Sequence, residues 1–188
     1  MKRIPFASLA VGATVLTAVL AGCSADQTTG LEPRIGAPVV MEAITRYEPI
    51  GSALSASATI GAEGGSFAIA EAGLTVTVPA GAVAEPTTFT ATARRGAIVA
   101  YDFQPSGSFD VPIQITQDLY YTSWHHQADL SDVFAGYYTG EGALDDEQAE
   151  AEVSEVPPSL VDVEKCKLTV LVSHFSGYVI ATGRNRRG

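Results

Sequence analysis

Few side chains of this chain could do chemistry, and one complementary pair stands together: His174 and Ser176. A serine hydroxyl is a potential nucleophile, and a nearby imidazole can assist proton transfer. Alternate side chains of a strand share a face, so the two would point the same way, and Gly177 permits a kink after them. An alternative to a catalytic role is that His174 and Ser176 have a purely structural role. Leu168 and Val172 have the same parity, so a regular strand would place a hydrogen-bonded histidine and serine at the end of a core face.

The two cysteines, Cys23 and Cys166, are too few for a disulfide scaffold or a four-cysteine zinc site. Cys23 ends a stretch without charge that follows Lys2 and Arg3, which is the form of a secretory signal. The segment Leu20-Ala21-Gly22-Cys23 closely resembles the bacterial lipobox. That resemblance implies cleavage before Cys23 and attachment of diacylglycerol and fatty acid, such as palmitate, to it. Two or three acyl chains are enough for stable membrane anchoring.

The same resemblance predicts a location. Residues 1–22 would be the signal peptide, and Ser24 rather than Asp would follow the lipidated cysteine. In didermal lipoproteins that choice favours the outer over the inner membrane. The alternative is an ordinary signal peptide with a chance cysteine. Cys166 lies among apolar residues in a strand-like run, which favours a buried, inert thiol.

The charge balance excludes one large class of partner. The 188 residues hold 11 Lys and Arg against 21 Asp and Glu, a formal net charge of −10. Nucleic-acid binding needs clustered basic residues, so no nucleic-acid partner is expected. The chain also lacks a nucleophile elbow, a P-loop and a dinucleotide fingerprint, so we expect no cofactor.

Two segments invite a metal interpretation, and neither has suitable spacing. Adjacent side chains of Trp124-His125-His126 would point to opposite faces of an extended segment, so the histidines chelate poorly together. Residues 145–155 are rich in Asp and Glu, but Asp145-Asp146-Glu147 lacks the alternation of a calcium loop. We expect no metal site and a solvated acidic loop, with cation binding by that loop as an alternative.

The rest of the chain supplies the elements that position these residues. Residues 23–58 lack a core pattern and are expected to form the lipidated N-terminus and a flexible linker. From 59 to 182 the hydrophobic period is two, as in 74–78, 87–93 and 111–116, with frequent turn residues. This pattern predicts an all-β fold, an antiparallel β-sandwich, followed by a basic tail at 183–188.

Four motifs in this region resemble the ZU-five domain, a β-sandwich module of zonula occludens proteins, netrin receptors and ankyrins. They lie in the order expected of the family and cover about residues 59–182. The motifs are Ala62-Glu63-Gly64-Gly65-Ser66-Phe67, Gly73-Leu74-Thr75-Val76-Thr77-Val78-Pro79-Ala80-Gly81-Ala82-Val83, Gly107-Ser108-Phe109-Asp110-Val111-Pro112-Ile113 and Ser173-His174-Phe175-Ser176-Gly177-Tyr178. The chain departs from the family at 119–163, which is longer and more acidic than expected.

In some relatives the His-Phe-Ser segment is an autoproteolysis site. Carried over, the Ser176 hydroxyl would attack the Phe175 carbonyl in an N→O acyl shift, and His174 would act as general base. The reaction also requires a twisted peptide between Phe175 and Ser176, because the twist raises the ground-state energy of the amide and so makes the acyl shift accessible.

Three functions follow as hypotheses. The first is a lipid-anchored, non-enzymatic binding or structural module of the cell envelope, with an envelope protein or glycan as partner. Its contact surface would be a sheet edge or a patch of Tyr120, Tyr121 and Trp124. The second is self-processing between Phe175 and Ser176. The third is cation binding by the acidic segment.

Overall fold

The computed structural model describes residues 34–125 and 132–183, which form an antiparallel all-β fold with no α-helix in these ranges. This confirms the predicted fold class. Two short 3₁₀ turns, η1 (Ala70–Ala72) and η2 (Glu141–Ala143), interrupt the strands. The strands are β1 (Arg34–Ala43), β2 (Thr45–Ile50), β3 (Leu54–Ile60), β4 (Gly65–Ile69), β5 (Leu74–Val78), β6 (Thr87–Ala93), β7 (Gly96–Ile98), β8 (Ala100–Asp118), β9 (Val133–Tyr138), β10 (Leu144–Asp145), β11 (Glu150–Val156), β12 (Ser159–Asp162) and β13 (Lys167–Thr182).

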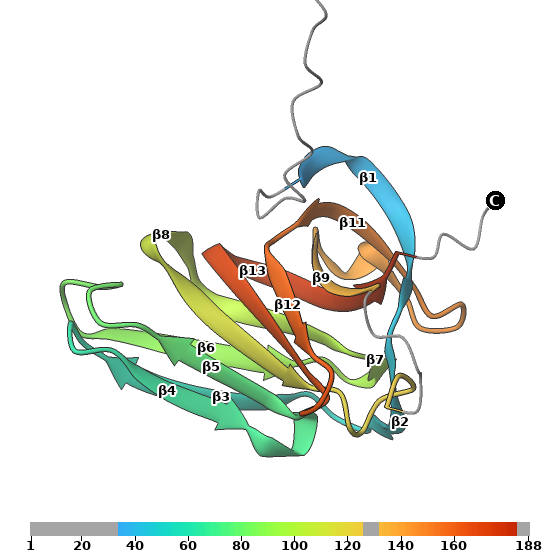
Figure 1. Cartoon of the computed structure of the whole chain (residues 1–188), viewed down its shortest axis with the longest axis horizontal. Helices are drawn as coiled ribbons and strands as arrows, with labels where there is room; N and C mark the ends of the chain where they lie inside the picture. Colours follow the sequence, from blue (N-terminus) through green and yellow to red (C-terminus); the bar gives the residue numbers. More distant parts are fainter. Residues whose placement is uncertain (1–33, 126–131, 184–188) are drawn as a thin grey trace, which may run out of the picture.

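The two long strands, β8 and β13, organise the molecule and pair with each other antiparallel. The far edge of β8 branches: residues 114–117 pair with β5, and residues 101–104 pair with β6. β4 extends the first branch and β3 the second. Figure 1 shows β3, β4, β5 and β6 together in one half of the molecule, with β1, β9 and β11 in the other.

In that second half, four strands close into a ring. β13 pairs with β9, β9 with β11 and β11 with β1, and β1 returns to β13 through Glu42–Thr182 and Ala43–Ala181. A second, smaller apolar cluster packs in this half, made of Ala43, Tyr138, Ala151, Val153 and Val179 from the ring strands, with Ile98 from β7 and Ala100 from β8. The interior of the ring is narrow. A Cβ added at Gly136 would lie only 2.5 Å from a methyl of Val153.

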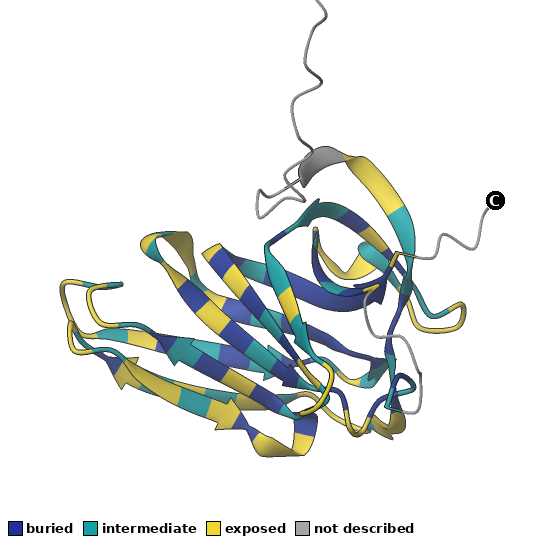
Figure 2. Ribbon diagram, in the orientation of Figure 1, coloured by how far each residue is buried: buried dark blue, intermediate teal, exposed yellow. Residues whose placement is uncertain are grey.

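The main core lies between the branches of the sheet and is strongly aromatic. Along β5 and β6 buried residues alternate with more exposed ones, as expected of strands with one wet face (Figure 2). Phe175 sits at the centre, its ring centroid 5.0 Å from that of Phe103 and 5.0 Å from that of Phe109. Phe89 packs edge-on to it at 5.7 Å.

The predicted strands at 74–78 and 87–93 coincide with β5 and β6, and the predicted strand at 111–116 is part of β8. The predicted start of the domain at Thr59 is wrong, because residues 34–58 of the expected linker contain β1, β2 and most of β3. In β3 small residues hide the period of two: Ala56 and Ala58 alternate with serines. The hydroxyls of Ser55 and Ser57 pair across the sheet with those of Thr92 and Thr90, both at 2.8 Å.

Two further segments differ from expectation. Half of the expected acidic loop is strand β11, because its apolar residues Ala151 and Val153 are buried in the apolar cluster of the ring, while Glu152 between them is exposed. Residues 103–107, whose proline and glycine residues are typical of a turn, are instead part of β8, where the pairing register with β13 shifts. The two-layer sandwich and the ZU-five-like topology stay predictions. No helix within the described ranges has the length and apolarity needed to cross a bilayer.

Candidate functional site

The predicted catalytic segment lies between two irregularities in the pairing of β13 with β8. Val172 faces Ile113, but His174 faces Ser108; Phe175 faces Gly107, but Gly177 faces Asp102. At each step β8 contains extra residues, as in a β-bulge. The Phe175–Ser176 peptide is therefore next to the second irregularity.

The first irregularity changes which side chains of β13 face the core. Val172 and Phe175 are both buried, although their positions differ by an odd number. The expected regular strand, with His174 and Ser176 continuing the core face of Val172, is therefore not observed. In a regular strand every second side chain has the same facing, so the facing of the β13 side chains changes within this irregularity.

Both ring nitrogens of His174 lie near groups other than Ser176. Nε2 is 3.0 Å from Oε2 of Glu155 on β11, and Nδ1 is 3.4 Å from the hydroxyl of Tyr178. That hydroxyl donates a 2.9 Å hydrogen bond to the His174 carbonyl. The ring of Tyr137 packs edge-on against the imidazole, with centroids 5.4 Å apart. The histidine thus links β13 to β11 across β9.

Ser176 lies on the same strand but outside this network. Its Oγ is buried and has no hydrogen-bond partner among the described residues. A general base must reach the proton that it removes, at about 2.6–3.2 Å or through one water. The structure therefore does not bring His174 and Ser176 into the hydrogen bond that an acyl shift would use.

Cys166 lies in the turn before β13, partly buried, rather than in the strand itself. Its Sγ is 3.7 Å from Nδ1 of His125. Burial raises the pKa of the Cys166 thiol, and the charge of Asp118 raises it further. A raised pKa reduces the thiolate fraction, so this cysteine is not activated as a nucleophile.

The two segments that invited a metal interpretation share no common centre among the described residues. Among the described residues no group of three or more His, Cys, Asp or Glu is arranged to hold a metal ion. His126 lies outside the described residues, as do Cys23, Ser24 and most of the basic tail. In the acidic segment, Asp145 caps a turn through the amides of Glu147 and Gln148, whereas Asp146 lies 3.3 Å from the amide of Ile98.

The expected aromatic patch is only partly formed. Tyr120 and Tyr121 are 52% and 64% exposed and pack edge-on at 5.0 Å, but Trp124 is buried in the core. Tyr47, 53% exposed, joins the two tyrosines because its amide donates to the Tyr121 carbonyl. The sequence separation between β2 and this loop explains why Tyr47 was not predicted.

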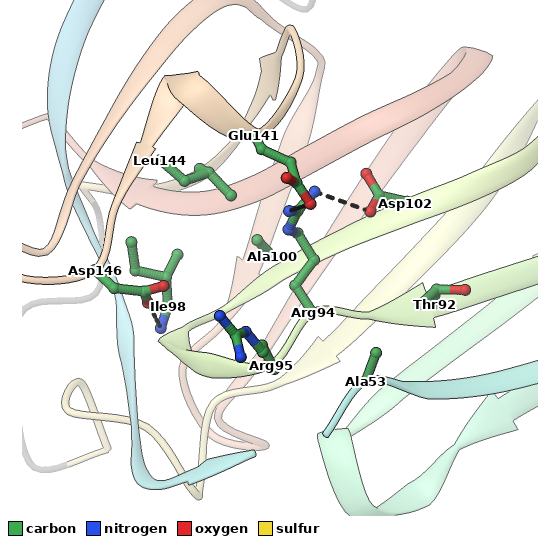
Figure 3. Close-up of a pocket in the computed structure, with 10 residues that line it drawn as sticks. All are labelled: Ala53, Thr92, Arg94, Arg95, Ile98, Ala100, Asp102, Glu141, Leu144 and Asp146. Carbon is green, nitrogen blue, oxygen red and sulfur yellow. Dashed lines mark hydrogen bonds and ion pairs between the residues drawn. The ribbon is translucent and has the colours of Figure 1, made fainter. Parts of the chain in front are cut away.

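A cavity of about 390 Å³ lies where the two halves of the molecule meet (Figure 3). Arg94 at its wall bonds Asp102 at 3.1 Å and Glu141 at 2.6 Å. Asp102 also accepts a 2.8 Å hydrogen bond from the Tyr138 hydroxyl. Burial raises the pKa of Tyr138, and its hydrogen bond to Asp102 adds to the shift. The network joins β6, β8, β9 and η2, and sequence reasoning did not single out any of its members.

Neither the comparison with family models nor the search of curated proteins returns a match for this chain.

Proposed function

We propose that this protein is a lipid-anchored module of a bacterial cell envelope that works by binding or as a structural element, and not by catalysis. The observation that carries the proposal is the segment Leu20-Ala21-Gly22-Cys23 at the end of a charge-free stretch. Acylation of Cys23 would hold the β domain at a membrane surface, with Ser24 directing it to the outer membrane.

The non-catalytic part of the proposal is supported by how the reactive side chains are used. His174 is engaged with Glu155 and Tyr178, and the Cys166 thiol has a raised pKa. The Arg94 cavity is lined by ion pairs that its own residues complete. Exposed tyrosines at Tyr47, Tyr120 and Tyr121 supply a surface suited to a partner.

The anchor is tested by expressing the full chain in a didermal bacterium with labelled palmitate. We expect label on the wild type and on Cys166→Ser, none on Cys23→Ser, and an N-terminal peptide that begins with acylated Cys23. Ser24→Asp should move the protein from the outer to the inner membrane fraction. An unlabelled product that retains residues 1–22 would contradict the proposal.

A further inference from the structure

A second cavity, of about 630 Å³, opens beside the exposed tyrosines. Strand β2 contributes Arg46 to its wall, η1 contributes Glu71, and the end of β8 contributes Gln117. Tyr121 and Thr122 from the following loop also line it. Its volume is within the range typical of sites for small molecules.

The wall of this cavity concentrates the buried polar groups of the fold. Four polar or charged side chains are buried in the described part of the chain, and three of them, Arg46, Gln117 and Thr122, line this cavity. Gln117 Nε2 donates to the Ala72 carbonyl, and Thr122 Oγ1 donates to that of Leu119. Gln117 and Thr122 therefore already have partners.

Arg46 is different, because its charge is buried and incompletely paired. Its side chain is 9% exposed, Nη1 donates to the Ile98 carbonyl, and Cζ lies 5.6 Å from the centre of the Tyr101 ring. Nε and Nη2 are buried without a hydrogen-bond partner, and no carboxylate of the described residues forms an ion pair with Arg46. Burial of a guanidinium is destabilising unless an anion and hydrogen bonds compensate the lost hydration. A carboxylate has the geometry to supply both.

The remaining charges of the cavity restrict what can carry that carboxylate. Glu48, Glu71 and Asp118 also line it, so a simple anion would be repelled. A ligand with an ammonium group beside its carboxylate complements both the positive charge of Arg46 and the negative charges of these carboxylates. The rings of Tyr47 and Tyr121 line the same cavity and can face the ammonium group through cation–π contacts.

We propose that this cavity binds a free α-amino acid, with the ligand carboxylate on Arg46 and its ammonium group toward Glu48, Glu71 and Asp118. Nε and Nη2 of Arg46 are shielded from bulk water in this structure, so the ligand carboxylate reaches them only if the wall of the cavity moves on binding. The proposal deepens the binding role proposed above and rests on it for its biological meaning. Palmitate labelling tests the lipid anchor, and ligand titration tests the cavity. A negative result in one experiment therefore leaves the other proposal standing.

The test is a titration of the purified protein with a panel of free amino acids, by thermal melting and then calorimetry. At least one amino acid should raise the melting temperature and bind saturably, because a ligand that binds only the folded state stabilises it. Acetate and methylammonium, each with one of the two charges, should bind at least about tenfold more weakly. Glucuronate has a carboxylate but no ammonium group, so glucuronate binding as tightly as the best amino acid would overturn the assignment. The absence of binding by every amino acid tested would also overturn it.

Variants locate the site. Arg46→Met should abolish binding, and Glu71→Gln should weaken it. Arg95→Met, a change at an arginine of the other cavity, should leave affinity unchanged and serves as the matched control. If Arg46→Met fails to fold, Glu71→Gln and Tyr121→Ala still decide the question, because both residues are on the surface. Unchanged affinity in these two variants would overturn the proposal.

Discussion

Nε2 of His174 lies 3.0 Å from Oε2 of Glu155, a contact that reaches from β13 to β11 across the intervening β9. The two side chains are 29% and 15% exposed, so the pair is largely shielded from water. Because the His174 imidazole is held by Glu155, it does not form a hydrogen bond with the Ser176 hydroxyl two residues later. The imidazole has a structural role in joining three strands.

We expect the chain to remain intact after Phe175. Intact mass measurement of the purified protein should give one species, identical in processing to Ser176→Ala. Because the Ser176 hydroxyl is buried and unpaired, Ser176→Ala should leave the free energy of unfolding unchanged or raise it by up to about 1 kcal/mol. His174→Ala should lower it by about 1–3 kcal/mol, because Glu155 loses its partner. A fragment that begins at Ser176 and disappears in both variants would contradict this.

The ring of four strands should tolerate no added atom at Gly136. Gly136→Ala places a Cβ 2.5 Å from Val153, and the overpacking should cost about 1–3 kcal/mol in urea unfolding. Val153→Ala removes the clashing methyls, so the double variant should be less destabilised than the sum of the two single changes. Strict additivity would show that the two positions do not touch.

The Arg94 network should depend on Asp102 far more than on Glu141. Asp102 serves both Arg94 and the Tyr138 hydroxyl, so Asp102→Ala should cost about 1–2 kcal/mol of unfolding free energy. Glu141 is 87% exposed, and Glu141→Ala should cost less than about 0.5 kcal/mol. Denaturant unfolding of the two variants side by side distinguishes them, and equal losses would contradict the assignment.

Stability should fall steeply in alkali. Burial raises the pKa of Tyr101, Tyr138 and Tyr178, so the folded state holds these phenols neutral. An unfolded tyrosine has a pKa of about 10. Above that pH the unfolded state loses protons that the folded state keeps, so stabilisation that is complete below about pH 10 is lost as the pH rises.

Urea unfolding across an alkaline pH series, combined with tyrosinate absorbance, measures this effect. The three phenols should ionise together with unfolding, and Tyr138→Phe should make the fall in stability less steep. Ionisation of all three in a protein that stays folded would contradict the prediction.

Local patterns of residues are enough to predict the all-β class and the positions of strands whose apolar residues alternate with polar ones, such as β5 and β6. That information is local, since a period of two is a property of consecutive residues. It failed for β3, where alanine and serine give little contrast, and for β11, where the count of carboxylates concealed two inward-facing apolar residues.

Which chemical groups come into contact depends on how the strands pack in three dimensions. The contacts of His174 with Glu155, and of Arg46 with the Ile98 carbonyl and the Tyr101 ring, join residues far apart in the chain. These contacts depend on the register in which the strands pair. The register between β8 and β13 shifts at the segment that contains His174 and Ser176, the pair predicted from the sequence to be catalytic. Such a shift changes which side chains lie opposite one another, and the local sequence pattern does not record where the shift will occur.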